Sequence, residues 1–308
     1  MLTTVQSSAS ASFNPRQLLS PAELTPLNQR SNLAGTGRLA AHLAVMAVSG
    51  YLWETAPGWL ALPALVVYGA SLAFMFCAVH ECVHRTAFAN TRANDAIAWL
   101  AGLLSFYNST FYRHYHKWHH RYTRVPGKDP ELEDPEPKTL SQYLWHLTGF
   151  SWWIGKIKGH LRAALGDLDD CPFLSDSARR EVIRSTQLQL GTYIAVGLIA
   201  AAIGHPYFLV TGWLLPLAVG QPLLRFVLLA EHTGCTYGDN LLTNTRTTLT
   251  LWPLRLLMWN MPYHAEHHLY PSIPFHALPQ AHQTLKQHFA SVDSGYLRVN
   301  QKIVQQLS

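Results

Sequence analysis

The sequence predicts an all-α integral membrane protein, with four transmembrane helices in two hairpins and a cytosolic helical cap that holds a histidine-rich site for two metal ions. Three observations lead to this fold. Only 13% of the 308 residues are charged, against about 25% in soluble proteins. Four apolar stretches are joined in pairs by short turns. The 17 histidines nearly equal the 18 acidic residues in number, and many of them cluster beside those stretches.

Composition excludes several other classes of protein. With 48% hydrophobic residues, including 10 Trp, 13 Tyr and 12 Phe, the chain is too apolar to be intrinsically disordered. Its 4 cysteines are scattered and form no CxxC pair, which excludes a disulfide scaffold, a zinc ribbon and a ferredoxin-type cluster. The net charge of +5 is compatible with nucleic-acid binding, but the distribution of the basic residues indicates a membrane instead.

The apolar stretches define the predicted spans. A helix needs roughly 20 residues to cross the hydrocarbon core. The second stretch meets this length, the fourth nearly does, and the other two need flanking residues or a thin bilayer. Turns at 54–58 and 204–206 join the stretches into two hairpins. The stretches are, in order, 39–53, 60–79, 188–203 and 207–224.

Lys and Arg predict the orientation. Neither turn contains either residue, and every basic residue except Arg225 lies before the first stretch, between the second and third, or after the fourth. Because cytoplasmic loops collect Lys and Arg, both termini and the cap are expected in the cytosol. The alternative is a soluble protein with two buried hairpins. Arg225 itself is expected to snorkel to the interface, with contact to an acyl head group as the alternative.

Nine histidines have the spacing of metal ligands. Residues three or four apart share one face of a helix, so HxxxH and HxxHH patterns bring imidazoles together. Nine nitrogens exceed the needs of one ion and favour two, while imidazole suits zinc, copper, iron and nickel alike. The nine are His80, His84, His116, His119, His120, His232, His264, His267 and His268. Eight others are expected to be structural or solvent-facing: His42, His114, His146, His160, His205, His276, His282 and His288.

Two functions from other classes fit parts of this pattern. Glu81 makes the first cluster an HExxH motif, which zinc proteases use, but a zinc hydrolase needs only three protein ligands and leaves the remaining histidines without a role. A non-enzymatic metal carrier is expected to place ionisable ligands within its spans. Glu81 and Glu266 are expected instead to accept hydrogen bonds from ligand imidazoles, and the acidic run 129–136 to form a solvated loop or a docking surface for an electron donor.

The histidine motifs resemble those of the membrane fatty-acid desaturase family. Its three boxes have counterparts in HECVH, HKWHH and HAEHH, and the stretches LLAEHTGC, NTRTT and NMPYHAEHHLYPSIPFHALP are also similar. The resemblance covers roughly residues 35–285, which leaves 1–34 as an expected flexible polar tail and 286–308 as a carboxy-terminal tail. The same boxes are shared by hydroxylases, ketolases and alkene-forming decarboxylases, so these remain alternatives within the fold.

The resemblance implies two iron ions held by the nine histidines, with O₂ as co-substrate, and the introduction of a double bond into a fatty-acyl or other lipid chain. Breaking an alkyl C–H bond needs a redox-active cofactor, which zinc is not. One position departs from the family: animal acyl-CoA desaturases have an asparagine ligand where this chain has Leu228. The sequence shows no cysteine quartet and no G-x-G-x-x-G motif. Electrons are therefore expected from an external ferredoxin, rubredoxin or cytochrome with its reductase.

Overall fold

The computed structural model describes residues 17–308, and this part of the chain is mostly helical. The first hairpin consists of α2 (Asn32–Thr55) and α3 (Gly58–Val83), which pack along their length. The Ser31 side chain accepts a hydrogen bond from the Ala34 N–H and so caps α2, and Pro57 interrupts the helix between the two. Helix α3 is the central element, because it also packs against α4 and α9.

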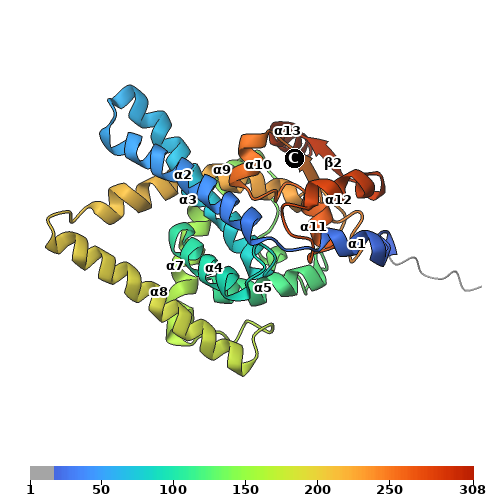
Figure 1. The fold of residues 1–308 in the computed structure, drawn as a ribbon, viewed down its shortest axis with the longest axis horizontal. Helices are drawn as coiled ribbons and strands as arrows, with labels where there is room; N and C mark the ends of the chain where they lie inside the picture. The colour runs from blue at the N-terminus through green and yellow to red at the C-terminus, as the bar shows by residue number, and fades with distance from the viewer. Residues whose placement is uncertain (1–16) are drawn as a thin grey trace, which may run out of the picture.

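The second pair of apolar helices is α8 (Asp176–Ala202) and α9 (Leu215–His232), with the π-helical turn η3 (Val210–Leu214) before α9. These two helices diverge from their connecting turn (Figure 1). Instead, α9 packs on α3 at a contact between Gly69 and Gly220. A Cβ atom at Gly220 would lie 1.9 Å from the Gly69 carbonyl oxygen, so only glycine permits this approach of the two backbones.

Two of the four predicted spans are long and apolar enough to cross a membrane. These are the helices Gly58–Val83 and Val210–His232. Among the helices of residues 17–308, α2 and α8 are not apolar over a full span length. Their apolar stretches are short, and polar residues make up the rest of each helix. In α8 the amino-terminal part is the polar one, and this helix packs against α5 and α7 of the cap.

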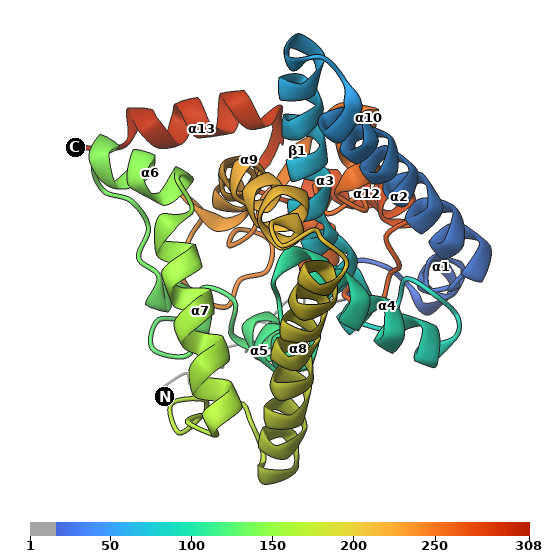
Figure 2. The ribbon, with the colours of Figure 1, turned by 90° about the vertical axis from the view of Figure 1, so that its left-hand side faces the viewer.

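The cap surrounds the ends of α3 and α9. In Figure 2 these two helices lie at the centre, with α6 and α7 on one side and α2 on the other. Strands β1 and β2 form a short parallel pair in which Thr247 is opposite Val292. The cap elements are α4 (Thr91–Ser105), α5 (Ser109–Tyr122), η2 (Pro130–Glu133), α6 (Leu140–Leu147), α7 (Phe150–Leu165), β1 (Thr247–Leu249), α10 (Trp252–Leu257), α11 (His264–Leu269), α12 (Leu278–Leu285), η4 (Lys286–His288), β2 (Val292–Ser294) and α13 (Tyr296–Gln305).

Both segments that flank the expected domain contain packed helices where the structure describes them. Residues 1–16 lie outside the described part, but α1 (Pro21–Leu27) begins with a capping box between Ser20 and Glu23. Leu27 at its end is buried in a cluster with residues of α12. At the other terminus, α13 packs against α9 and buries Ile303. Residues 17–34 and 286–308 are therefore packed parts of the domain, because each carries apolar side chains that the core covers.

Candidate metal centre

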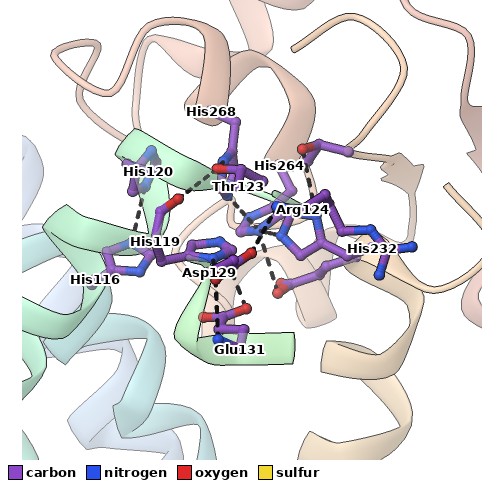
Figure 3. A network of polar contacts seen from close by, with 12 residues as sticks. His116, His119, His120, Thr123, Arg124, Asp129, Glu131, His232, His264 and His268 are labelled. Carbon is purple, nitrogen blue, oxygen red and sulfur yellow. Dashed lines mark hydrogen bonds and ion pairs between the residues drawn. The ribbon is translucent and has the colours of Figure 1, made fainter. Parts of the chain in front are cut away.

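All nine predicted histidines gather at one place in the cap. Two lie at the carboxyl end of α3, three on α5, one at the end of α9 and three on α11. Asn108 caps α5 by accepting a hydrogen bond from the Phe111 N–H, so the helix begins where its HxxHH face can meet α3. Figure 3 shows the α5 histidines with His232, His264 and His268.

Five of the histidines form the first group. Their ligand nitrogens all lie within 4.8 Å of one another. The His120 Nε2 atom is 3.0 Å from His116 Nε2 and 3.1 Å from His267 Nε2. The Nε2 atoms of His80 and His84 are buried and have no hydrogen-bond partner among the described residues. The members of the group are His80, His84, His116, His120 and His267.

The second group lies beside the first. It consists of His119, His232 and His268, whose ligand nitrogens also lie within 4.8 Å of one another. His264 joins them, since its Nε2 atom is 3.2 Å from His232 Nε2 and 3.1 Å from His268 Nε2. The rings of His120 and His268 stack with centroids 4.2 Å apart and so connect the two groups. The structure thus divides the nine histidines into five and four.

The protonation state of these imidazoles suits the binding of metal cations. Burial, reinforced by the neighbouring imidazoles, holds the pKa of His116, His120 and His267 well below the ordinary value, and burial lowers that of His84 to about 4. The rings are therefore neutral at pH 7. Neutral imidazole nitrogens that converge on a point, some of them buried without a partner, present the lone pairs that a metal ion needs.

The outer nitrogens of four rings are fixed by hydrogen bonds. Each such contact sets the orientation of the ring and directs its other nitrogen inward. The contacts join Nδ1 of His116 to the Tyr112 hydroxyl at 3.2 Å, of His119 to Asp129 Oδ1 at 2.9 Å, of His232 to the Asn244 carbonyl at 3.0 Å, and of His268 to the Thr123 hydroxyl at 3.1 Å.

Asp129 is the functional side chain that the sequence analysis missed, because it begins the acidic run predicted to be solvated. Its carboxylate is buried and also accepts hydrogen bonds from the backbone N–H groups of Arg124, at 2.7 Å, and Glu131, at 3.0 Å. Burial alone would lower the pKa of His119, but the carboxylates of Glu131 and Asp129 outweigh it and raise that pKa. The fold-back of η2 onto α5 produces this contact, and no local spacing in the sequence indicates it.

The roles predicted for Glu81 and Glu266 are wrong. Glu81 accepts hydrogen bonds from the Thr86 hydroxyl and the Phe275 N–H, at 3.1 Å for the latter. Glu266 is bonded to Thr247 and His282. Neither carboxylate contacts one of the nine histidines in the described structure.

Two other carboxylates face the second group. The Glu231 Oε2 atom lies 3.4 Å from His264 Nε2, and the Glu131 Oε2 atom lies 3.6 Å from His119 Nε2. The Glu231 Oε1 atom is buried without a hydrogen-bond partner among residues 17–308. Leu228, one turn before His232, lines the same cavity and offers no ligand atom. The two carboxylates therefore place oxygen atoms, which could act as metal ligands, next to this group.

A cavity of about 670 Å³ leads to the histidines. Its lining includes residues of α7 and α9 and five of the nine histidines. Its volume lies within the range of small-molecule sites, roughly 300–1,000 Å³. Aromatic rings such as Phe76, Tyr107 and Trp152 make up part of its wall. The cavity thus gives a small molecule access to the histidine groups.

Comparison with known proteins gives a consistent picture. The family model described as "Fatty acid desaturase" matches residues 57–299. "Dihydrorhizobitoxine desaturase" from Bradyrhizobium elkanii is 28% identical over 90% of this chain and 80% of that protein. "Delta(5) fatty acid desaturase fat-4" from Caenorhabditis elegans is 26% identical over 77% of this chain and 59% of that protein. "Sphingolipid delta(4)-desaturase DES1" from Homo sapiens is 28% identical over 73% of this chain and 67% of that protein.

Proposed function

Because this chain belongs to the fatty acid desaturase family and is a desaturase-type oxidoreductase, we propose that it introduces a double bond into a fatty-acyl or other lipid chain, using O₂ and two iron ions. The observation that supports this most strongly is the division of nine histidines into two adjacent groups, five of whose members line a cavity of substrate size. Abstraction of hydrogen from an alkyl chain needs a redox-active cofactor, and two metal ions held by these groups would supply one.

The histidines would hold the two ions as follows. The first group of five binds one ion, and the second group, with His264, binds the other. When bound, the iron pair supplies the oxidising power, which no side chain of the protein has. The protein itself orients the imidazoles through Asp129, Thr123, Tyr112 and the Asn244 carbonyl, and its cavity walls hold the substrate chain next to them.

The proposed placement in the membrane has four spans, α2, α3, α8 and the η3–α9 segment, with both termini and the cap in the cytosol. Figure 1 shows both hairpin turns on the side of the molecule away from the carboxy-terminal elements. Many large apolar side chains on these helices are exposed, as expected for contact with lipid. They include Leu43, Val48, Tyr51, Leu52, Trp59, Leu60, Leu62, Val66, Val67, Leu188, Ile194, Leu198, Ile199, Leu215 and Leu223.

We propose a membrane desaturase domain over residues 35–285, against which residues 17–34 and 286–308 pack. Cysteine labelling tests its orientation. Ala56→Cys and His205→Cys, in the two hairpin turns, should react with an impermeant reagent from outside the cell, whereas Ala290→Cys should react only after permeabilisation. Labelling of His205→Cys and Ala290→Cys from the same side would contradict four spans.

The function is tested by metal analysis together with lipid profiling. Purified protein should contain about two iron ions per chain, and a host that expresses it should gain an unsaturated lipid that the same host without the gene lacks. His267→Ala should lose bound iron and activity while its helical circular dichroism stays unchanged. His288→Ala, an exposed histidine outside both groups, is the matched control. One zinc ion per chain, or full activity of His267→Ala, would refute the proposal.

A further inference from the structure

Two cationic side chains face the substrate cavity away from the histidines. Lys156 comes from α7 and Arg225 from α9, and both line the cavity. They converge on Tyr107: the Lys156 Nζ atom lies 3.9 Å from the centroid of its ring, and Arg225 Nη2 donates a hydrogen bond to its hydroxyl oxygen at 3.0 Å. Trp152 completes the cluster, with its ring 5.5 Å from the Arg225 guanidinium carbon.

Neither cation forms an ion pair within the described structure, although the carboxylates of Glu131 and Glu231 line the same cavity. No Asp or Glu oxygen of residues 17–308 lies within 4.0 Å of the charged nitrogens of Lys156 or Arg225. The Arg225 Nε atom is buried without a hydrogen-bond partner in the described structure. Burial, and then the charge of Arg225, lower the pKa of Lys156 to about 7. Two like charges held together at partly buried positions are unfavourable unless an anion joins them.

The cluster also offers a neutral hydrogen-bond donor. The Tyr107 hydroxyl oxygen accepts hydrogen bonds from Trp152 Nε1 and Arg225 Nη2, each at 3.0 Å. A phenol has one proton to donate, and both of these contacts use the oxygen as acceptor. The hydroxyl proton is therefore free to point to a ligand. An ammonium group, a guanidinium group and a phenol proton together match the acceptor oxygens of a carboxylate or a phosphate.

We propose that Lys156, Arg225 and Tyr107 form a subsite for an anionic oxygen group of the substrate, so that this enzyme acts on an acidic lipid or fatty acid whose head group is held inside the cavity. This inference rests on the proposed function, because it names the substrate class of that reaction. The anion would form ion pairs with both cations, which have no such pair among residues 17–308. It would also satisfy the Arg225 Nε donor that has no partner in the described structure.

The position of the subsite limits which carbons can react. Arg225 and His232 are seven residues apart on α9, which corresponds to about 10 Å along the helix axis. A head group bound at Arg225 thus places carbons near the head, rather than the distant end of the chain, beside the histidine groups.

Helix α7 connects the subsite to the lipid. Its outer face exposes Ile154, Ile157 and Leu161, while Lys156 lies on the face that lines the cavity. This arrangement is that of an amphipathic helix in the membrane interface. The head group of an acidic lipid at the same depth would thus meet the two cations without leaving the interface.

The inference is tested by binding, without turnover. Full-length protein in zwitterionic nanodiscs is dialysed against radiolabelled dodecanoate, methyl dodecanoate or dodecyl phosphate, with empty nanodiscs as the blank. The protein is assayed both as purified and after removal of metal with a chelator. At least one of the two anions should bind about tenfold or more tightly than the neutral ester, as expected for a charge-assisted contact. Preference between dodecanoate and dodecyl phosphate then identifies a carboxylate or a phosphate ligand.

Substitutions locate the effect. The double variant Lys156→Met/Arg225→Met should bind the anions no better than the ester, whereas Lys156→Arg and Arg225→Lys should keep most of the preference. Lys158→Met is the matched control, because Lys158 is exposed on the same helix and does not line the cavity. If the double variant does not fold, the comparison of anions with ester in the unmodified protein still decides the question.

The possible failures are distinguishable. Equal binding of both anions and the ester by the unmodified protein, or an undiminished preference in a folded double variant, would overturn the anion subsite even if the enzyme desaturates a neutral lipid. Selective anion binding by a protein that contains no iron and oxidises no lipid would leave the subsite in place and refute the proposed function.

Discussion

At the scale of single residues, the candidate metal centre depends on side chains outside the two histidine groups. Asp129 is the clearest case, because it holds His119 through Nδ1 and is itself held by two backbone N–H groups. A carboxylate in this position fixes the tautomer of the ring and increases its basicity as a ligand. The sequence predicted the ligands from their helical spacing, but it gave no indication of Asp129, since that contact is made by a turn after the helix.

Replacing Asp129 by Ala is expected to weaken metal binding at the second group about 10- to 100-fold, the usual cost of losing such a partner. Asp129→Asn, which keeps an acceptor oxygen, should lie between Ala and the unmodified protein. The measurement is iron content after dialysis against a series of chelator concentrations. Asp134→Asn, in the same loop with a side chain 73% exposed, should match the unmodified protein. Equal iron retention by Asp129→Ala would show that the contact with His119 is only structural.

At the scale of elements, helix α7 separates the cavity from the outer surface. Its apolar residues recur every three or four positions from Phe150 to Leu165 and are exposed, while its opposite face lines the cavity. Hydrophobicity averaged over a span-length window identifies α3 and α9 but not this helix, because its apolar residues are confined to one face and polar residues occupy the other. Its 3.6-residue period was the observation in the sequence that would have indicated an interfacial helix.

Gly155, on the cavity face of α7, gives a test of this arrangement. A Cβ atom added there would meet no atom within 4 Å, and leucine favours helix more than glycine by up to about 1 kcal/mol. Gly155→Leu should therefore keep the fold and its iron while the new side chain fills part of the cavity and lowers turnover severalfold.

The control for this substitution is Gly191→Leu. Gly191 also lies in open space on a long helix, α8, but does not line the cavity, so lipid product in that variant should stay at the level of the unmodified protein. Product formation would be measured at matched protein and iron content. Unchanged turnover of Gly155→Leu over a range of chain lengths would mean that the substrate does not pass α7.

At the scale of the whole molecule, the prediction from sequence was most successful where one physical property dominates. Apolar length indicated α3 and α9, and the histidine spacing indicated which helix faces meet. It gave less information about α8, whose polar half packs against α5 and α7, and about the terminal segments, where α1 and α13 pack on the core. These contacts join residues far apart in the chain, and periodicity within a segment carries no information about them.

The arrangement of charge on the cap predicts how electrons arrive. Oxidation of a C–H bond with O₂ in this way draws two electrons from outside the substrate, and we propose that a separate acidic carrier protein supplies them. Helix α5 holds His116, His119 and His120 on its inner face, whereas Lys117 and Arg121 are exposed on its outer side, near exposed Lys128. Trp118 donates a hydrogen bond from Nε1 to the Lys128 carbonyl at 3.0 Å, and the charged groups of Arg121 and Lys128 lie over the Tyr122 ring. A carrier docked on this face would be separated from the histidine groups by a single helix.

We therefore expect Lys117→Glu/Arg121→Glu to raise the KM for the carrier, while kcat at saturating carrier stays close to that of the unmodified protein. The same charges should make coupling weaken with added salt, because attraction between exposed charges is screened beyond the roughly 10 Å Debye length at 0.1 M. Arg298→Glu replaces an exposed residue on α13. It changes the net charge by the same amount as each of the two α5 substitutions and should leave the KM for the carrier unchanged. The assay supplies iron-loaded protein in lipid with O₂, substrate, NADPH, reductase and a ferredoxin, rubredoxin or cytochrome. Turnover that continues without any carrier would show that the electrons take another route, and a KM indifferent to both salt and charge reversal would place the docking surface elsewhere.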